Sequence, residues 1–147
     1  MIIESLKSLY NRDLNKLKLE IESYKSEDAI WKIDKNISNS AGNLCLHLVG
    51  NLNTYIGSEL GKTGYIRNRE LEFSLKDIPK AELVEKVEST IKMIDSTLVK
   101  LSQEDLKKDY PQETLGYKMT TGYFLIHLLS HLNYHLGQIN YHRRFLD

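Results

Sequence analysis

The sequence is poor in the features that mark several classes of protein. Cys45 is the only cysteine among 147 residues, so no disulfide can form within the chain, and we expect a reducing, cytoplasmic setting. No segment approaches the ~20 apolar residues of a membrane-spanning helix, and the first residues lack the apolar core and cleavage site of a signal peptide. Neither charge is in excess, because 20 Lys and Arg balance 20 Asp and Glu. We therefore expect neither a membrane nor a nucleic acid as partner.

Prolines are equally scarce, and the two that are present, Pro79 and Pro111, fall where a helix boundary is expected. Apolar residues recur at spacings of three and four in four segments, which predicts helices over residues 3–24, 44–56, 83–101 and 122–145. Pro79 suits the first turn of the third helix, and Thr120 or Thr121 can cap the fourth. Residues 63–78 have no steady period and are predicted to be an ordered loop or an extended piece. Residues 105–119 are predicted to be a connection that includes a short hairpin.

The length and composition indicate one globular unit. A chain of 147 residues can bury a substantial core, and 41% hydrophobic with 27% charged residues is ordinary for a globular domain. Four long helices joined by two substantial connections favour an all-α fold, a four-helix bundle. The sequence therefore predicts a single four-helix-bundle domain over residues 1–147.

Histidines supply the main chemical signal. Three of the five stand four residues apart in the last predicted helix, as His127, His131 and His135, and His47 lies on the apolar stripe of the second. The helical rise separates His127 from His135 by about 12 Å, too far for one metal ion with bonds of about 2.0–2.1 Å. The pair is thus His127 with His131 or His131 with His135, and His47 is the candidate third ligand. The alternative is that these histidines are hydrogen-bonded core residues. His142 is expected either to be such a core residue or to lie at the surface.

Three neutral imidazoles would leave one tetrahedral position open to a small molecule, as in catalytic and not in structural sites. Zinc fits this donor set, and imidazole also suits nickel, copper and iron. Two residues are candidates to hydrogen-bond a bound water or to orient the ligand rings: Asn51, one turn after His47, and Gln138, three residues after His135.

Several motifs resemble the DinB-like superfamily. His131-Leu-Asn-Tyr-His135-Leu-Gly137-Gln138 is similar to the HxxxHxGQ signature of that superfamily, and the segment 43–51 is similar to the helix that carries its first histidine. The segment 64–73 resembles a subgroup of small, uncharacterised bacterial members. The resemblance covers essentially the whole chain and implies a four-helix bundle with a divalent metal, for which the imidazole donors lead us to expect zinc or nickel. It also implies His47, His131 and His135 as the ligands, with His127 outside the triad.

The same resemblance implies a function, because some relatives are transferases or isomerases that use a low-molecular-weight thiol. The first hypothesis is therefore a metal-dependent thiol S-transferase that acts on a small electrophilic molecule. Arg67 and Arg69 could bind carboxylates of an anionic thiol, although pairing with Glu70 and Glu72 in a solvated loop is the alternative. The second hypothesis is a non-catalytic metal-binding structural or interaction module, and the third is a metal-free bundle. Association into a homodimer through helix faces is also compatible with the sequence.

Overall fold

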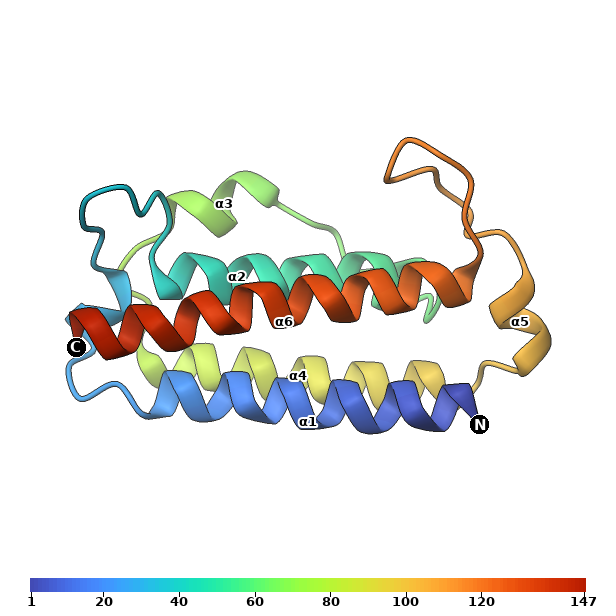
Figure 1. Cartoon of the computed structure of the whole chain (residues 1–147), viewed down its shortest axis with the longest axis horizontal. Coiled ribbons are helices and arrows are strands. Elements are labelled where there is room, and N and C mark those ends of the chain that lie inside the picture. Colours follow the sequence, from blue (N-terminus) through green and yellow to red (C-terminus); the bar gives the residue numbers. More distant parts are fainter.

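The computed structural model describes residues 1–147 and consists of helices and connections, with one isolated antiparallel bridge between Asp109 and Thr120. Four long helices run along the molecule (Figure 1): α1 (Ile2–Glu22), α2 (Ala41–Leu52), α4 (Lys80–Leu98) and α6 (Thr121–Leu146). The prediction of an all-α four-helix bundle with two longer connections is confirmed.

The four helices form a ring in which α1 contacts α4 and α6, and α2 also contacts α4 and α6. In Figure 1, α1 and α6 run in one direction, and α2 and α4 run in the other. The chain must therefore travel back along the bundle between α2 and α4, and its route carries the short helix α3 (Arg69–Ser74) against α2.

The helix α3 corrects the prediction of a loop or extended piece over residues 63–78. Asn68 caps α3 by accepting a hydrogen bond from the backbone N–H of Leu71 at 3.4 Å. At six residues, α3 is too short for an apolar period to reveal it. Its position against α2 is a tertiary effect.

The predicted boundaries of the long helices hold to within a few residues. Ser40 and Thr120 are the N-caps of α2 and α6, and each accepts from the backbone N–H three residues later. Pro79 precedes α4. The second predicted helix continues past α2 as a π-helical segment, η2 (Asn53–Ser58). The helix α5 (Gln103–Lys107) overlaps the start of the predicted 105–119 connection, and the hairpin is limited to the bridge between Asp109 and Thr120.

One core of 31 buried apolar residues fills the bundle. The first connection is anchored there by Trp31 at the end of a 3-10 helix, η1 (Asp28–Trp31). The Trp31 ring occupies the space where a Cβ at Gly42 would project, so the absence of a side chain at Gly42 permits this contact. No helix combines the length and the apolar character that crossing a bilayer requires.

Two side chains on α1 tie this helix to α6 through polar groups inside the bundle. The Tyr10 hydroxyl donates to the Leu125 carbonyl at 2.6 Å. The buried Asp13 carboxylate accepts from Arg12 at 2.7 Å and from Asn133 at 2.7 Å. Burial acts to raise the pKa of Asp13, but these hydrogen bonds outweigh it, and the pKa lies below its ordinary value.

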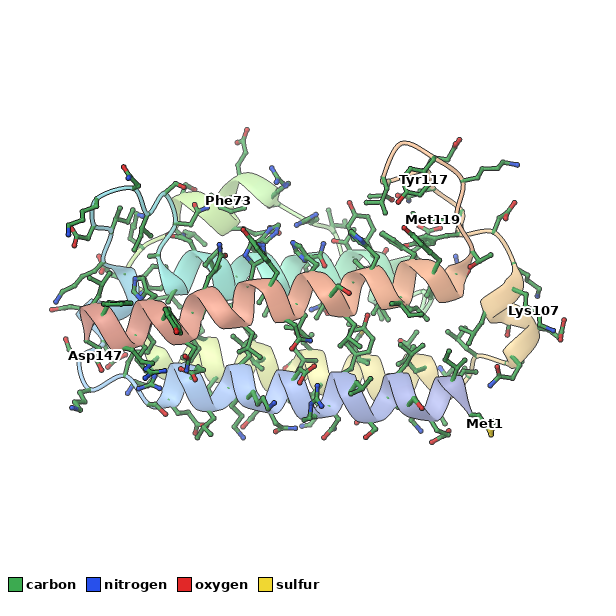
Figure 2. All side chains as sticks on the ribbon, viewed as in Figure 1. Met1, Phe73, Lys107, Tyr117, Met119 and Asp147 are labelled. Carbon is green, nitrogen blue, oxygen red and sulfur yellow. The ribbon has the colours of Figure 1, made fainter.

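The second connection protrudes from the end of the bundle where α6 begins. Figure 2 shows Tyr117 and Met119 on a loop that rises on the same side as Phe73 of α3. Tyr117 and Tyr123 join this loop to α6 through their hydroxyl groups, which lie 2.9 Å apart.

His142 is a hydrogen-bonded core histidine, one of the two predicted environments. Its Nδ1 accepts from the Tyr24 hydroxyl at 2.6 Å, and its Nε2–H donates to the Lys32 carbonyl at 2.8 Å. Burial lowers the pKa of His142 below its ordinary value. The ring is therefore neutral, with both nitrogens engaged.

Acid should destabilise the protein in part through His142. Because the folded-state pKa is lowered, the unfolded chain takes up the proton first as the pH falls. The contribution of the neutral His142 ring to the free energy of unfolding is complete above about pH 6.5 and is lost progressively below this pH. Urea unfolding at pH 7.5, 6.5 and 5.5 should give a falling free energy of unfolding. His142→Gln should give a shallower fall, by up to about 1.4 kcal/mol per pH unit. Parallel curves for the two proteins would contradict this.

Candidate metal centre

The antiparallel contact between α2 and α6 brings together three histidines. His131 Nε2 lies 3.2 Å from His47 Nε2 and 3.1 Å from His135 Nε2. One nitrogen from each of the three residues lies within 4.8 Å of the others. The register is continued by Tyr55 of η2, whose ring meets Phe124 two turns earlier in α6. The three histidines could therefore hold one metal ion between the two helices.

His127 does not belong to this group. Its ring is stacked on Phe124 with the planes at 7° and the centroids 5.9 Å apart. His127 is thus one helical turn before His131, on the side away from His135. Of the two pairs that helical spacing left open, the structure brings His131 and His135 together with His47.

The nitrogen separations fit the size of a transition-metal ion. Bonds of about 2.05 Å in tetrahedral geometry place two ligand nitrogens roughly 3.3 Å apart. The distances from His131 Nε2 to the other two Nε2 atoms, 3.2 and 3.1 Å, are close to this value. Two aligned neutral nitrogens at this distance cannot both be acceptors without a shared proton or cation.

The hydrogen bonds on the other side of two rings leave their Nε2 lone pairs available. His135 Nδ1 lies 2.7 Å from Gln138 Oε1, and His47 Nδ1 lies 3.1 Å from Glu72 Oε1. Both oxygens can only accept, so each Nδ1 must carry the proton. In the neutral ring Nε2 is then unprotonated, which is the form that binds a metal.

Glu72 on α3 is the group that links this site to the crossover connection. Its carboxylate accepts from Arg67 Nε at 2.8 Å and from Arg67 Nη2 at 2.9 Å. Arg67 Nη2 also lies 3.3 Å from His47 Nδ1, but guanidinium nitrogens only donate, so Glu72 is the partner of this Nδ1–H. Phe73 adds an apolar contact, with its ring 5.0 Å from that of His47.

A glycine on α2 makes room for the Glu72 carboxylate. A Cβ at Gly50 would overlap Glu72 Oε2. Burial acts to raise the pKa of Glu72, but hydrogen bonds from His47 and Arg67 outweigh it, and the pKa lies below its ordinary value. Glu72 is therefore held as an ionised acceptor, with its partner Arg67 beside it.

The electrostatic environment keeps His131 and His135 neutral. Burial, together with the repulsion that charged neighbouring histidines and Arg67 would exert, lowers the pKa of His131 to about 4. Burial also lowers the pKa of His135, against the opposing effect of Gln138. At neutral pH these two imidazoles are unprotonated, as ligands must be.

Two buried polar atoms near the triad have no hydrogen-bond partner, Asn51 Oδ1 and His131 Nδ1. Asn51 lies one turn after His47 on α2, and the pairs His47–His131 and Tyr55–Phe124 place it across from residues 127–128 of α6. With His131 Nε2 facing an ion, its Nδ1 would carry the proton and be a donor without an acceptor. Unsatisfied buried polar groups of this kind are expected at a site built for a further ligand.

The remaining predicted site residues have different surroundings. Gln138 contacts His135 from an exposed position, whereas Arg67 is engaged by Glu72, the alternative partner that the sequence had suggested. The pair is buried against His47 and not solvated. The Arg69 guanidinium lies over the Phe73 ring at 5.1 Å. Cys45 is fully buried, and burial raises its pKa to about 12, so it is a thiol packed in the core.

Glu72 is the residue of the candidate site that the sequence does not reveal. In the sequence it stands only as a possible partner for arginines in a loop. The one local signal is Asn68, which precedes a run with two glutamates as a helix cap does. Which glutamate would face His47 depends on how the crossover lies against α2.

Comparisons with known proteins identify the family and the fold. Residues 3–147 match the model of the family described as "Protein of unknown function (DUF1572)", so the chain belongs to this family. No functionally curated protein matches it significantly. The crystal structure of a conserved protein from Enterococcus faecalis superposes with a TM-score of 0.76. The match covers 99% of this chain and 97% of that one at 13% sequence identity, a likeness of fold alone.

Two glycines near the site should respond in opposite ways to substitution by alanine. Gly50→Ala should displace Glu72 and break its contacts with Arg67 and His47, which lowers stability by about 1–3 kcal/mol. Gly137→Ala is the matched control, since a Cβ there would meet no atom within 4 Å, and it should stabilise α6 by up to about 1 kcal/mol. Thermal unfolding of both variants without added metal measures this. A stabilised Gly50→Ala would contradict the packing of Glu72.

Proposed function

We propose that this member of the DUF1572 family binds one divalent transition-metal ion through His47, His131 and His135. The observation that carries the proposal is the convergence of three Nε2 atoms, two of them freed for coordination by Nδ1–H bonds to Glu72 and Gln138. Neutral imidazole donors favour zinc or nickel over the hard cations magnesium and calcium. Three protein ligands would leave a position for a small molecule.

We further propose that the ion serves a reaction on a small molecule. The motif around His131 and His135 resembles the DinB-like superfamily, and through that resemblance a thiol-dependent S-transferase is the reaction class we favour. When bound, the ion would supply a Lewis acid that lowers the pKa of a thiol beside it. The thiol sulfur would then form a bond to an electrophilic carbon, and its proton and the leaving group would pass to solvent.

The side chains around the triad would have distinct roles in this reaction. Glu72 and Gln138 hold the rings of His47 and His135 in one orientation. Arg67 holds Glu72, so its guanidinium is committed. Of the two arginines considered for an anionic thiol, Arg69 is the one we retain, because it is exposed and its guanidinium lies over the Phe73 ring without a carboxylate partner.

A second candidate function is a metal-binding structural or interaction module. The observation in its favour is that the carboxylate in contact with the triad, Glu72, is bound by Arg67 and His47 and so is not available as a general base. Turnover separates the two candidates. Metal-loaded protein tested with a panel of thiols and electrophiles should show thiol transfer that His131→Ala abolishes, and a module should show none. We also propose that the protein is located in the cytoplasm and that it forms a homodimer.

Metal stoichiometry should depend on His131 and not on His127. Protein purified without a nickel column and dialysed against zinc should retain about one ion per chain. His131→Ala should retain far less, because it removes the nitrogen that lies closest to both others. His127→Ala, the matched control on the same helix, should retain the full amount. Elemental analysis measures this, and equal loss in both variants would refute the triad.

Glu72 should tune metal affinity without being a ligand. Glu72→Ala leaves His47 Nδ1 without its acceptor, so zinc affinity should fall about 10–100-fold while the stoichiometry stays at one. Glu70→Ala, which changes a neighbouring exposed carboxylate on α3, should leave the affinity unchanged. Competition with a chromogenic chelator gives both values. Equal affinities in the two variants would remove Glu72 from the site.

A further inference from the structure

A cavity of about 880 Å³ lies beside the triad, between the C-terminal half of α6 and the segment 34–39. His135 and Gln138, the hydrogen-bonded pair of the metal centre, form part of its wall. Figure 1 shows the loop before α2 and the last turns of α6 at the same end of the molecule. The cavity therefore adjoins the candidate metal centre at His135.

Three aromatic side chains of α6 form one wall of this cavity. Tyr134, Tyr141 and Phe145 line it at spacings of seven and four, which places them along one side of the helix. They are 65%, 60% and 77% exposed, so no other part of the chain covers them. Ile37 and Leu44 add apolar surface. Exposed apolar surface beside a cavity marks a site of interaction, of which a ligand-binding groove is one kind.

The polar groups of the lining indicate what a ligand must carry. Asp34 and Lys35 contribute opposite charges, so the cavity offers no excess of either sign. Asn36, Ser38 and Asn39 supply amide and hydroxyl groups. Gln138 uses its oxygen for His135, which leaves its amide nitrogen able to donate to a ligand. A ligand with an uncharged body fits this lining better than a polyanion.

The size of the cavity selects a small molecule. Ligand sites for small molecules measure roughly 300–1,000 Å³. The ten helical steps from His135 to Phe145 span about 15 Å along α6, the length of two to three aromatic rings. One end of such a molecule would lie at the metal centre, and the other at Phe145.

We propose that this cavity binds the substrate of the metal centre, a small molecule with an uncharged aromatic or branched aliphatic body and a metal-coordinating head. The head would face His135, and the body would pack against Tyr134 and Tyr141. The proposal rests on the proposed function, because it requires an ion at the triad.

The test uses two hydroxamic acids that share a head and differ in the body. Acetohydroxamic acid has no apolar body, and biphenyl-4-carbohydroxamic acid has two rings. Both are titrated into full-length protein loaded with cobalt(II), whose visible absorption reports on head coordination. The biphenyl compound should bind at least about tenfold more tightly, since it buries its rings against the aromatic wall.

Two variants test whether the aromatic wall provides this gain in affinity. Tyr141→Ala should reduce the advantage of the biphenyl compound by about tenfold and leave acetohydroxamic acid unchanged. Tyr123→Ala is the matched control, a tyrosine on α6 that is 50% exposed and lies outside the cavity, and it should alter neither affinity.

The outcomes separate the inference from the function on which it rests. If cobalt binds and both compounds bind equally well, or if Tyr141→Ala retains the full advantage, the inference is wrong and the metal centre stands. If no cobalt binds to the triad, the proposed function fails and the inference fails with it.

Discussion

The parallel course of α2 and α4 is the constraint on which the candidate site depends. Two consecutive helices that point the same way require a connection that travels back along the bundle. Here that connection follows α2 and places α3 on it. Glu72 thereby reaches His47, and Gly50 leaves the space that its carboxylate fills. The position of Glu72 beside His47 is thus a consequence of chain topology, whereas the convergence of the three histidines follows from the packing of α2 against α6.

Much of the fold could be predicted because it is encoded locally. Apolar periods mark the four long helices, and the capping residues Ser40 and Thr120 stand where helices begin. The short α3 and α5 lack a period long enough to detect, and their positions depend on contacts with α2 and α6. The prediction of a loop over residues 63–78 missed α3 for this reason, although the residues on either side of α3 are non-helical as expected. Local patterns describe long amphipathic helices well and short ones poorly.

The candidate site, too, could be predicted only in part. Helical rise limited the histidines of the last helix to two possible pairs, and the apolar stripe of the second helix indicated His47. The resemblance then named His47, His131 and His135 as the three ligands. The choice between pairs is a matter of register between α2 and α6, which the contacts of Tyr55 with Phe124 and of His47 with His131 show. Glu72 could not be named, because no local rule says which face of α3 lies against α2.

The arrangement of charge within the bundle argues for a ligand at the triad. Buried groups elsewhere are satisfied within the chain: Asp13 by Arg12 and Asn133, and His142 by Tyr24 and Lys32. At the triad, three imidazole nitrogens face one another, and His131 Nδ1 and Asn51 Oδ1 lack partners. A buried polar cluster left incomplete is costly, and a cation among the Nε2 atoms would convert mutual repulsion into coordination. The same chain that satisfies its other buried polar groups leaves this one cluster open, which is how a binding site differs from a core.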